Sequence, residues 1–143
     1  MSDDLVDFLR ARLAEDEAAA VIASGVLHPA AHWSLDEWTG REEPHSLIAQ
    51  GTAAQPVLIG HFTADPVPTA QAAHIVRHDP ARVLREIQAY RTTVDEYEIA
   101  LWAQPDADQA AYWQARRDAL RETCLRIATV WADHPDHRSE WRP

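Results

Sequence analysis

The sequence predicts an α+β fold that is mainly α-helical, with a long antiparallel helical hairpin, an N-terminal helix and a small inserted antiparallel β-sheet. Three observations predict it. Apolar residues recur at helical spacing near both ends of the 143-residue chain. Residues 26–68 between them hold most of the glycines and prolines. Two apolar seams in the second half are joined by a short connection. At this length we expect one domain, residues 1–143.

The first helix is expected over residues 1–24. Ser2 can cap it, and the acidic residues after Ser2 suit the positive end of a helix. An apolar stripe follows, and Gly25 is a natural stop. The stripe consists of Leu5, Phe8, Leu9 and Leu13.

A small sheet is expected within residues 32–62. The segments 45–50 and 56–62 indicate two short strands joined by the small-residue loop GTAAQ. Residues 32–38 alternate apolar and polar side chains, which indicates a third strand whose pairing the sequence leaves open.

A short helix is predicted over residues 69–78, ending at an Asp-Pro step. The residue before a proline is pushed out of the α region, so Asp79 suits the N-cap of a new helix with Pro80 at its first position. Asp79 and Pro80 are thus predicted structural caps.

The hairpin is predicted from two long helices, residues 80–103 and 106–131, followed by a docked tail over 132–143. The tail has no periodicity, and its Trp141 is a large ring that should pack against the rest of the chain. The first seam is Val83, Ile87, Tyr90, Val94, Tyr97 and Leu101; the second is Trp113, Arg117, Leu120, Cys124, Ile127 and Trp131.

Composition narrows the class of protein. The formal net charge of −10 disfavours nucleic acid as a partner, because phosphate contacts need a basic surface. No apolar run approaches the length of a membrane span, and the acidic start does not resemble a secretory signal, so we expect a cytoplasmic protein and no membrane partner. All 13 basic residues are arginine, and neither lysine nor asparagine occurs, which indicates a GC-rich genome.

Three blocks resemble a known family. FLRARLAEDE near the start, HIVRHDPARVLRE in the middle and ADHPDHRSEWRP at the end are similar to small uncharacterised proteins of actinobacteria and their phages, a domain of unknown function. The blocks span residues 5–18, 73–87 and 132–143. The resemblance implies an origin and no activity.

The chain departs from that family pattern at possible metal ligands. Relatives can carry tryptophan or asparagine at the position of His78 and often tyrosine at that of His137. Many also have extra cysteines, whereas this chain has only Cys124. The resemblance therefore does not carry a metal site to this chain.

Four histidines are the metal candidates. His74 and His78 are four residues apart, the spacing of zinc ligands on one helix face. His134 and His137 could complete a zinc site if the tail folded back. The simpler interpretation places His74 on the buried side of its helix, His78 at the helix end and residues 133–137 in a turn. We favour it, and so predict no metal and no cofactor.

No catalytic residue is predicted. Cys124 lies on a helix seam, where a thiol is buried and inert. Ser46 is adjacent to His45 in a predicted strand, so the two side chains face opposite sides. No nucleophile elbow, phosphate loop or dinucleotide fingerprint occurs. We lean against an enzyme.

Tryptophans and arginines mark the hairpin as an interaction candidate. Trp102 and Trp113 flank its turn and should lie close together, and with Trp141 they are the predicted interaction residues. Arg116, Arg117, Arg121 and Arg126 form a basic stripe that neighbouring acids partly neutralise.

These features predict a non-catalytic accessory or interaction module that acts through another protein or self-association. One alternative is a histidine-dependent metal-binding protein or hydrolase using His74 and His134. A second is an acidic inhibitor of a nucleic-acid-acting enzyme.

Overall fold

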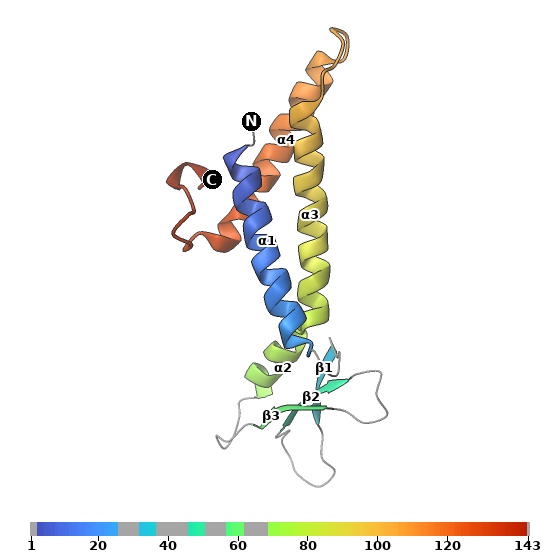
Figure 1. The fold of residues 1–143 in the computed structure, drawn as a ribbon, viewed down its shortest axis with the longest axis vertical. Coiled ribbons are helices and arrows are strands. Elements are labelled where there is room, and N and C mark those ends of the chain that lie inside the picture. The colour runs from blue at the N-terminus through green and yellow to red at the C-terminus, as the bar shows by residue number, and fades with distance from the viewer. Residues whose placement is uncertain (1–2, 26–31, 37–45, 51–56, 62–68, 143) are drawn as a thin grey trace. The chain divides into compact units, whose positions relative to one another are not determined.

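The computed structural model describes residues 3–25, 32–36, 46–50, 57–61 and 69–142, and they are mainly helical (Figure 1). The helices are α1 (Asp4–Ala23), α2 (Thr69–Arg77), α3 (Pro80–Trp102) and α4 (Ala110–Ala128), with two 3-10 turns, η1 (Thr129–Trp131) and η2 (Ser139–Trp141). The strands are β1 (His32–Asp36), β2 (Ser46–Gln50) and β3 (Val57–His61). Within the described residues, no helix combines the length and apolar character needed to cross a bilayer.

The chain divides into two compact units. The first unit is Met1–Glu15 with Ile87–Pro143, and the second is Asp16–Glu86. Helices α1 and α3 contribute residues to both units. Among the side chains whose burial the structure describes, most of the buried apolar ones belong to the first unit.

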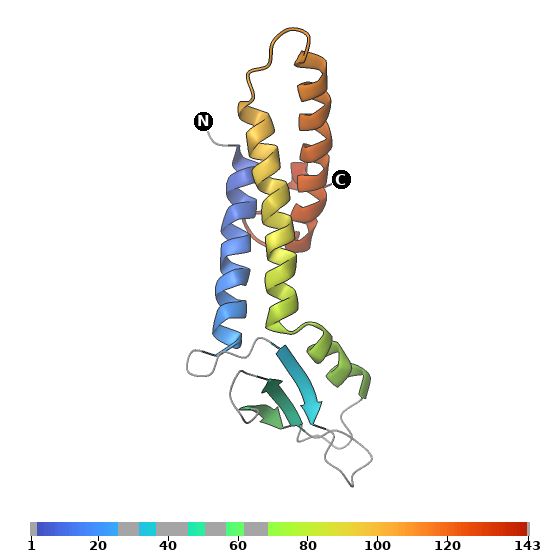
Figure 2. The same ribbon diagram turned by 90° about the vertical axis from the view of Figure 1, so that its right-hand side faces the viewer.

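The core of the first unit lies between α1, α3 and α4, and both views show α1 running alongside α3 (Figures 1 and 2). Fully burying a large aliphatic side chain contributes about 1.5–3 kcal/mol, so this cluster supplies most of the unit's packing energy. Its buried residues are Leu5, Val6, Phe8, Leu9 and Leu13 of α1, Ile87, Val94, Tyr97 and Ala100 of α3, and Cys124, Ile127 and Ala128 of α4.

The ends of α1 show how the sequence closes a helix. Asp3 Oδ1 accepts a hydrogen bond from the Leu5 amide at 2.9 Å, so Asp3 caps the helix. Ser2, the cap suggested by the sequence, lies outside the described residues. At the other end Gly25 has φ 90°, which glycine adopts without a Cβ clash.

In the second unit the three strands pair antiparallel in the order β1-β2-β3. Trp33 is opposite Ala49 and Ser46 is opposite His61, with a register shift between Leu47 and Ile48. The predicted strand ends at residues 37–38, 45, 56 and 62 lie outside the described residues, as does the GTAAQ loop.

The hairpin connection is longer than predicted. Helix α3 ends at Trp102, and α4 begins at Ala110 instead of residue 106. The Gln109 amide donates to the Asp106 carbonyl at 3.0 Å, which closes a separate turn before α4 can start. At its far end α4 stops at Ala128, and η1 continues the chain to Trp131.

Candidate functional site

The outer part of the hairpin buries no side chain. From residue 101 to residue 123, a segment described throughout, every residue is at least partly exposed; we call it the distal hairpin. In both views α1 begins partway along α3 and α4, and the hairpin continues beyond it (Figures 1 and 2). The distal hairpin is therefore a two-helix segment without the third helix that covers its base.

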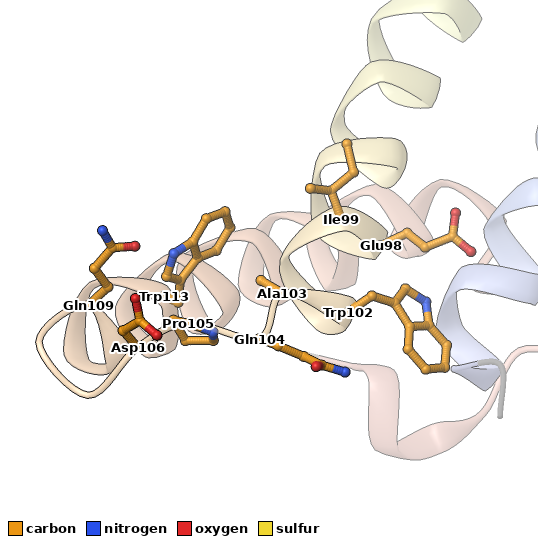
Figure 3. Close-up of a pocket in the computed structure, with 9 residues that line it drawn as sticks. All are labelled: Glu98, Ile99, Trp102, Ala103, Gln104, Pro105, Asp106, Gln109 and Trp113. Atoms are coloured by element: carbon orange, nitrogen blue, oxygen red, sulfur yellow. The ribbon is translucent and has the colours of Figure 1, made fainter.

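An open hollow of about 660 Å³ lies at the end of the hairpin (Figure 3). Trp102 is 59% exposed and Ile99, three residues earlier on α3, is 63% exposed. Trp102 and Trp113 both line the hollow, and Figure 3 shows them on opposite sides of Ala103. Trp113 meets Tyr112 edge-on, with ring centroids 5.7 Å apart.

A second hollow, of about 430 Å³, lies on α4. Tyr112 borders it and is 61% exposed. Apart from Arg116 and Leu120, the other side chains that line it are small. The lining residues are Tyr112, Ala115, Arg116, Ala119, Leu120 and Thr123.

Ion pairs within the chain neutralise part of the hairpin's charge. Arg10 of α1 binds Asp95 at 2.7 Å and Glu98 at 2.6 Å. Arg116 of α4 binds Glu96 of α3 at 3.1 Å, which joins the two arms of the hairpin. All these groups are substantially exposed, so each pair contributes about 0–1 kcal/mol.

On α4 itself, Arg126 pairs with Glu122 one turn earlier, a pairing that the sequence predicted. Arg117 donates to Gln114 at 3.3 Å. The basic stripe is therefore only partly neutralised by neighbouring groups.

A buried arginine joins α1 to the C-terminal tail. Arg12 is 7% exposed, and its Nη1 lies 2.7 Å from Nδ1 of His134 and also contacts Nε2 of the same ring. Its Nη2 donates to Glu15 at 2.7 Å, and Asp136 lies 3.7 Å from Nη1. We call Arg12, Glu15, His134 and Asp136 the Arg12 junction.

Aromatic rings extend the Arg12 junction. The Phe8 ring centroid is 4.9 Å from that of Trp141, 6.0 Å from that of His134 and 5.8 Å from that of His137. Trp141 is 4% exposed. The C-terminal tail thus packs on α1, and Trp141 is not available as an exposed anchor.

The candidate metal ligands lie in different surroundings. His74 and His78 are exposed, and their ring centroids are 4.4 Å apart. The predicted burial of His74 is wrong, because the half-buried side of α2 falls on Ile75 and Val76. His137 packs against Phe8, as His134 does. Among the described residues, no three His, Cys, Asp or Glu side chains group as metal ligands would.

Asp79 stands at the start of α3, with Pro80 as the first helical residue. Its Oδ1 accepts a hydrogen bond from the Arg82 amide at 2.8 Å, the geometry of an N-cap. Its Oδ2 lies 3.2 Å from Nδ1 of His32 in β1. Sequence reasoning missed His32, because no local pattern signals a contact 47 residues away.

Cys124 is fully buried, and burial with the nearby charge of Asp3 raises the pKa of its thiol to about 12. The thiol is therefore protonated at neutral pH, whereas a nucleophile must be a thiolate. Tyr97, also buried, donates to Asp3 at 3.2 Å, and burial and Asp3 raise its pKa to about 12.

Comparison with known proteins identifies the family of the chain. The model of a family of unknown function (DUF6221) matches residues 2–143, so the chain belongs to that family. No curated protein matches the sequence, and no solved structure matches the chain.

Proposed function

We propose that this member of a family of unknown function is a non-catalytic protein-interaction module of the cytoplasm whose distal hairpin binds another protein chain. The observation that carries the proposal is the absence of any buried side chain between residues 101 and 123. Most of a helix's stability in a protein comes from packing its apolar face, and in this segment no side chain is more than partly covered. A partner that covers the segment would supply it.

The exposed side chains are of the kind that anchor protein interfaces. Trp102 and Tyr112 are each more than half exposed, as is Ile99 beside Trp102. Tryptophan and tyrosine dominate binding energy at interfaces, because they bury a large area at a low entropic cost. Two open hollows lie next to these side chains and offer room for a partner's side chains.

A non-catalytic role is supported by the state of the reactive side chains. The Cys124 thiol is buried and protonated at neutral pH. His134 is engaged by Arg12, and His137 packs on Phe8 and Trp141. The lysine-free and asparagine-free composition supports the further proposal that the gene belongs to a GC-rich actinobacterial or phage genome.

Site-specific photocrosslinking in the cells that encode the chain tests the proposal. A photoreactive residue placed at Trp102 should give one discrete protein adduct, and Ile99→Asp should weaken it. The same residue placed at Ile22, which is 70% exposed outside the hairpin, is the matched control. Identical adducts from both positions, or none from position 102, would contradict the proposal.

A further inference from the structure

We infer that the occupant of the distal hairpin is a second copy of the chain, and that two hairpins pair through their distal halves as a four-helix bundle. This inference rests on the proposed interaction role and adds the identity of the partner. Two antiparallel hairpins are a common source of such bundles. The surface that pairs must then be complementary to itself under a two-fold rotation.

Acidic and basic side chains gather in different parts of the hairpin. Residues 94–109, the end of α3 and the turn, contain five acidic side chains and no basic one. Helix α4 contains four arginines against two acids. A surface with one acidic and one basic region suits a copy of itself better than a partner of a single charge sign. The acids of residues 94–109 are Asp95, Glu96, Glu98, Asp106 and Asp108.

After the ion pairs within the chain are formed, two groups of charged side chains of opposite sign are left without an ion pair among the described residues. Asp95, Glu96 and Glu98 already bind arginines of the same chain. No ion pair joins Asp106 or Asp108 of the turn, or Arg117 or Arg121 of α4, to any residue that the structure describes. The Nε of Arg117 is shielded from solvent and lacks a hydrogen-bond partner there as well. We call the two pairs the turn acids and the α4 arginines.

An antiparallel two-fold arrangement brings these groups together. Arg117 and Arg121 are one helical turn apart, so they share a face of α4. At 1.5 Å per residue they lie roughly 10–17 Å along α4 from Ala110. When two hairpins overlap by this length with opposite directions, the turn acids of each lie beside the α4 arginines of the other. Both copies of the contact form at once.

Exposed apolar side chains at the end of α3 supply the apolar part of the contact. Trp102 is 59% exposed and Ile99 is 63% exposed, and an aromatic side chain can bury about 150–250 Å². Trp113 of α4 lines the same hollow as Trp102 and lies one helical turn from Arg117. Both copies contribute these side chains, so the apolar contact forms twice.

A charge-reversal pair of variants tests the inference with purified protein. The first variant carries Arg117→Glu and Arg121→Glu, so that its turn and its α4 are both acidic. The second variant carries Asp106→Arg and Asp108→Arg, so that its turn and its α4 are both basic. Sedimentation velocity should give twice the chain mass for the wild type, the chain mass for each variant alone, and twice the chain mass for their equimolar mixture. Recovery in the mixture also shows that both variants are folded. The control is Arg77→Glu with Arg142→Glu, two exposed arginines outside the hairpin, which should remain dimeric.

Each other outcome overturns the inference. A wild-type chain that stays monomeric at tens of micromolar, variants that remain dimeric, or a mixture that stays monomeric would each do so. Crosslinking from Trp102 to a different protein, with a monomeric wild type, would remove the second copy and leave the proposed function standing. A dimer that resists both charge reversals would place self-association on another surface.

Discussion

Arg12 in α1 contacts the imidazole of His134, a residue 122 positions later in the chain, with Nη1 2.7 Å from Nδ1. A guanidinium has no acceptor, so the ring nitrogen that meets it accepts the hydrogen bond. Arg12 is buried, so removing its acceptor would leave a donor that neither water nor another group satisfies, which costs folding free energy. The contact therefore holds the C-terminal tail on α1.

Replacing His134 should destabilise the first unit. We expect His134→Ala to lower the free energy of unfolding by about 1–3 kcal/mol, because Arg12 is left without this acceptor. His134→Gln, which keeps an acceptor, should recover part of the loss. His78→Ala, at an exposed ring, should stay within about 0.5 kcal/mol of the wild type. Urea unfolding measures all three, and equal losses at His134 and His78 would contradict the role of the Arg12 junction.

Trp141 should act as a core residue although it lies near the end of the chain. Trp141→Ala removes a ring that packs 4.9 Å from Phe8, and we expect a loss of about 3–5 kcal/mol. Trp102→Ala, measured on dilute protein, should change stability little, because Trp102 is mostly exposed. Thermal unfolding of the two variants gives the comparison. Similar midpoints would show that the tail contributes no packing.

Asp79 should stabilise the first turn of α3. Asp79→Ala is expected to cost about 1 kcal/mol, and Asp79→Asn, which keeps a capping oxygen, should cost much less. Hydrogen exchange at the Arg82 amide should accelerate in the alanine variant, since that amide loses its acceptor. Asp108→Ala in the hairpin turn serves as a control for removal of a carboxylate. Unchanged exchange at Arg82 would argue against the cap.

Stability should fall at alkaline pH. Burial raises the pKa of Cys124 from 9.0 to about 12 and that of Tyr97 from 10.0 to about 12. The unfolded chain therefore loses these protons first and binds fewer of them between about pH 9 and pH 12, so stability decreases as pH rises through that window. Below pH 9 the folded and the unfolded chain both keep the protons of Cys124 and Tyr97, so these two groups do not make stability depend on pH there.

Replacing the thiol should shift the start of that decline. In Cys124→Ala the fall should begin near pH 10, where tyrosine titrates, instead of near pH 9. The chain has no lysine, so no ammonium group titrates in the same range. Urea midpoints measured across the range give the result. Identical profiles for variant and wild type would show that Cys124 titrates alike in both states.

Metal content separates the interaction module from the histidine-dependent alternative. We expect elemental analysis of untagged protein to find no stoichiometric zinc, and His74→Ala to leave metal content and fold unchanged. Stoichiometric zinc that disappears in His74→Ala would instead support the alternative that pairs His74 with His134. His32→Ala, a second exposed histidine of the second unit, controls for loss of a surface imidazole.

Local patterns in the sequence were sufficient to predict the helices and the start of α3, but not the start of α4. The seam of α3 predicts Ile87, Val94 and Tyr97 as buried, and they are. The Asp-Pro step locates the start of α3, because proline restricts the residue before it. On α4 the seam overpredicts burial: Trp113 and Leu120 are only partly covered. A heptad pattern predicts which face of a helix packs against a neighbour. It does not predict the length of helix that the neighbour covers.

Contacts between segments that are distant in the sequence could not be predicted from local patterns. Nothing near His134 predicts Arg12, and nothing near Asp79 predicts His32, because folding alone brings these segments together. The resemblance blocks 5–18 and 132–143 are informative in retrospect, since Phe8 and Arg12 of the first meet His134 and Trp141 of the second.

The division into units has a consequence for biosynthesis. The second unit is one uninterrupted segment, Asp16–Glu86, so all residues that make its internal contacts are present once that segment has emerged from the ribosome. The first unit must wait: Asp3 meets Tyr97 across 94 positions, and Arg12 meets His134 across 122. Until then the apolar face of α1, with Phe8 at its centre, stays uncovered on the nascent chain. That interval is when the protein is most open to chaperones and to aggregation.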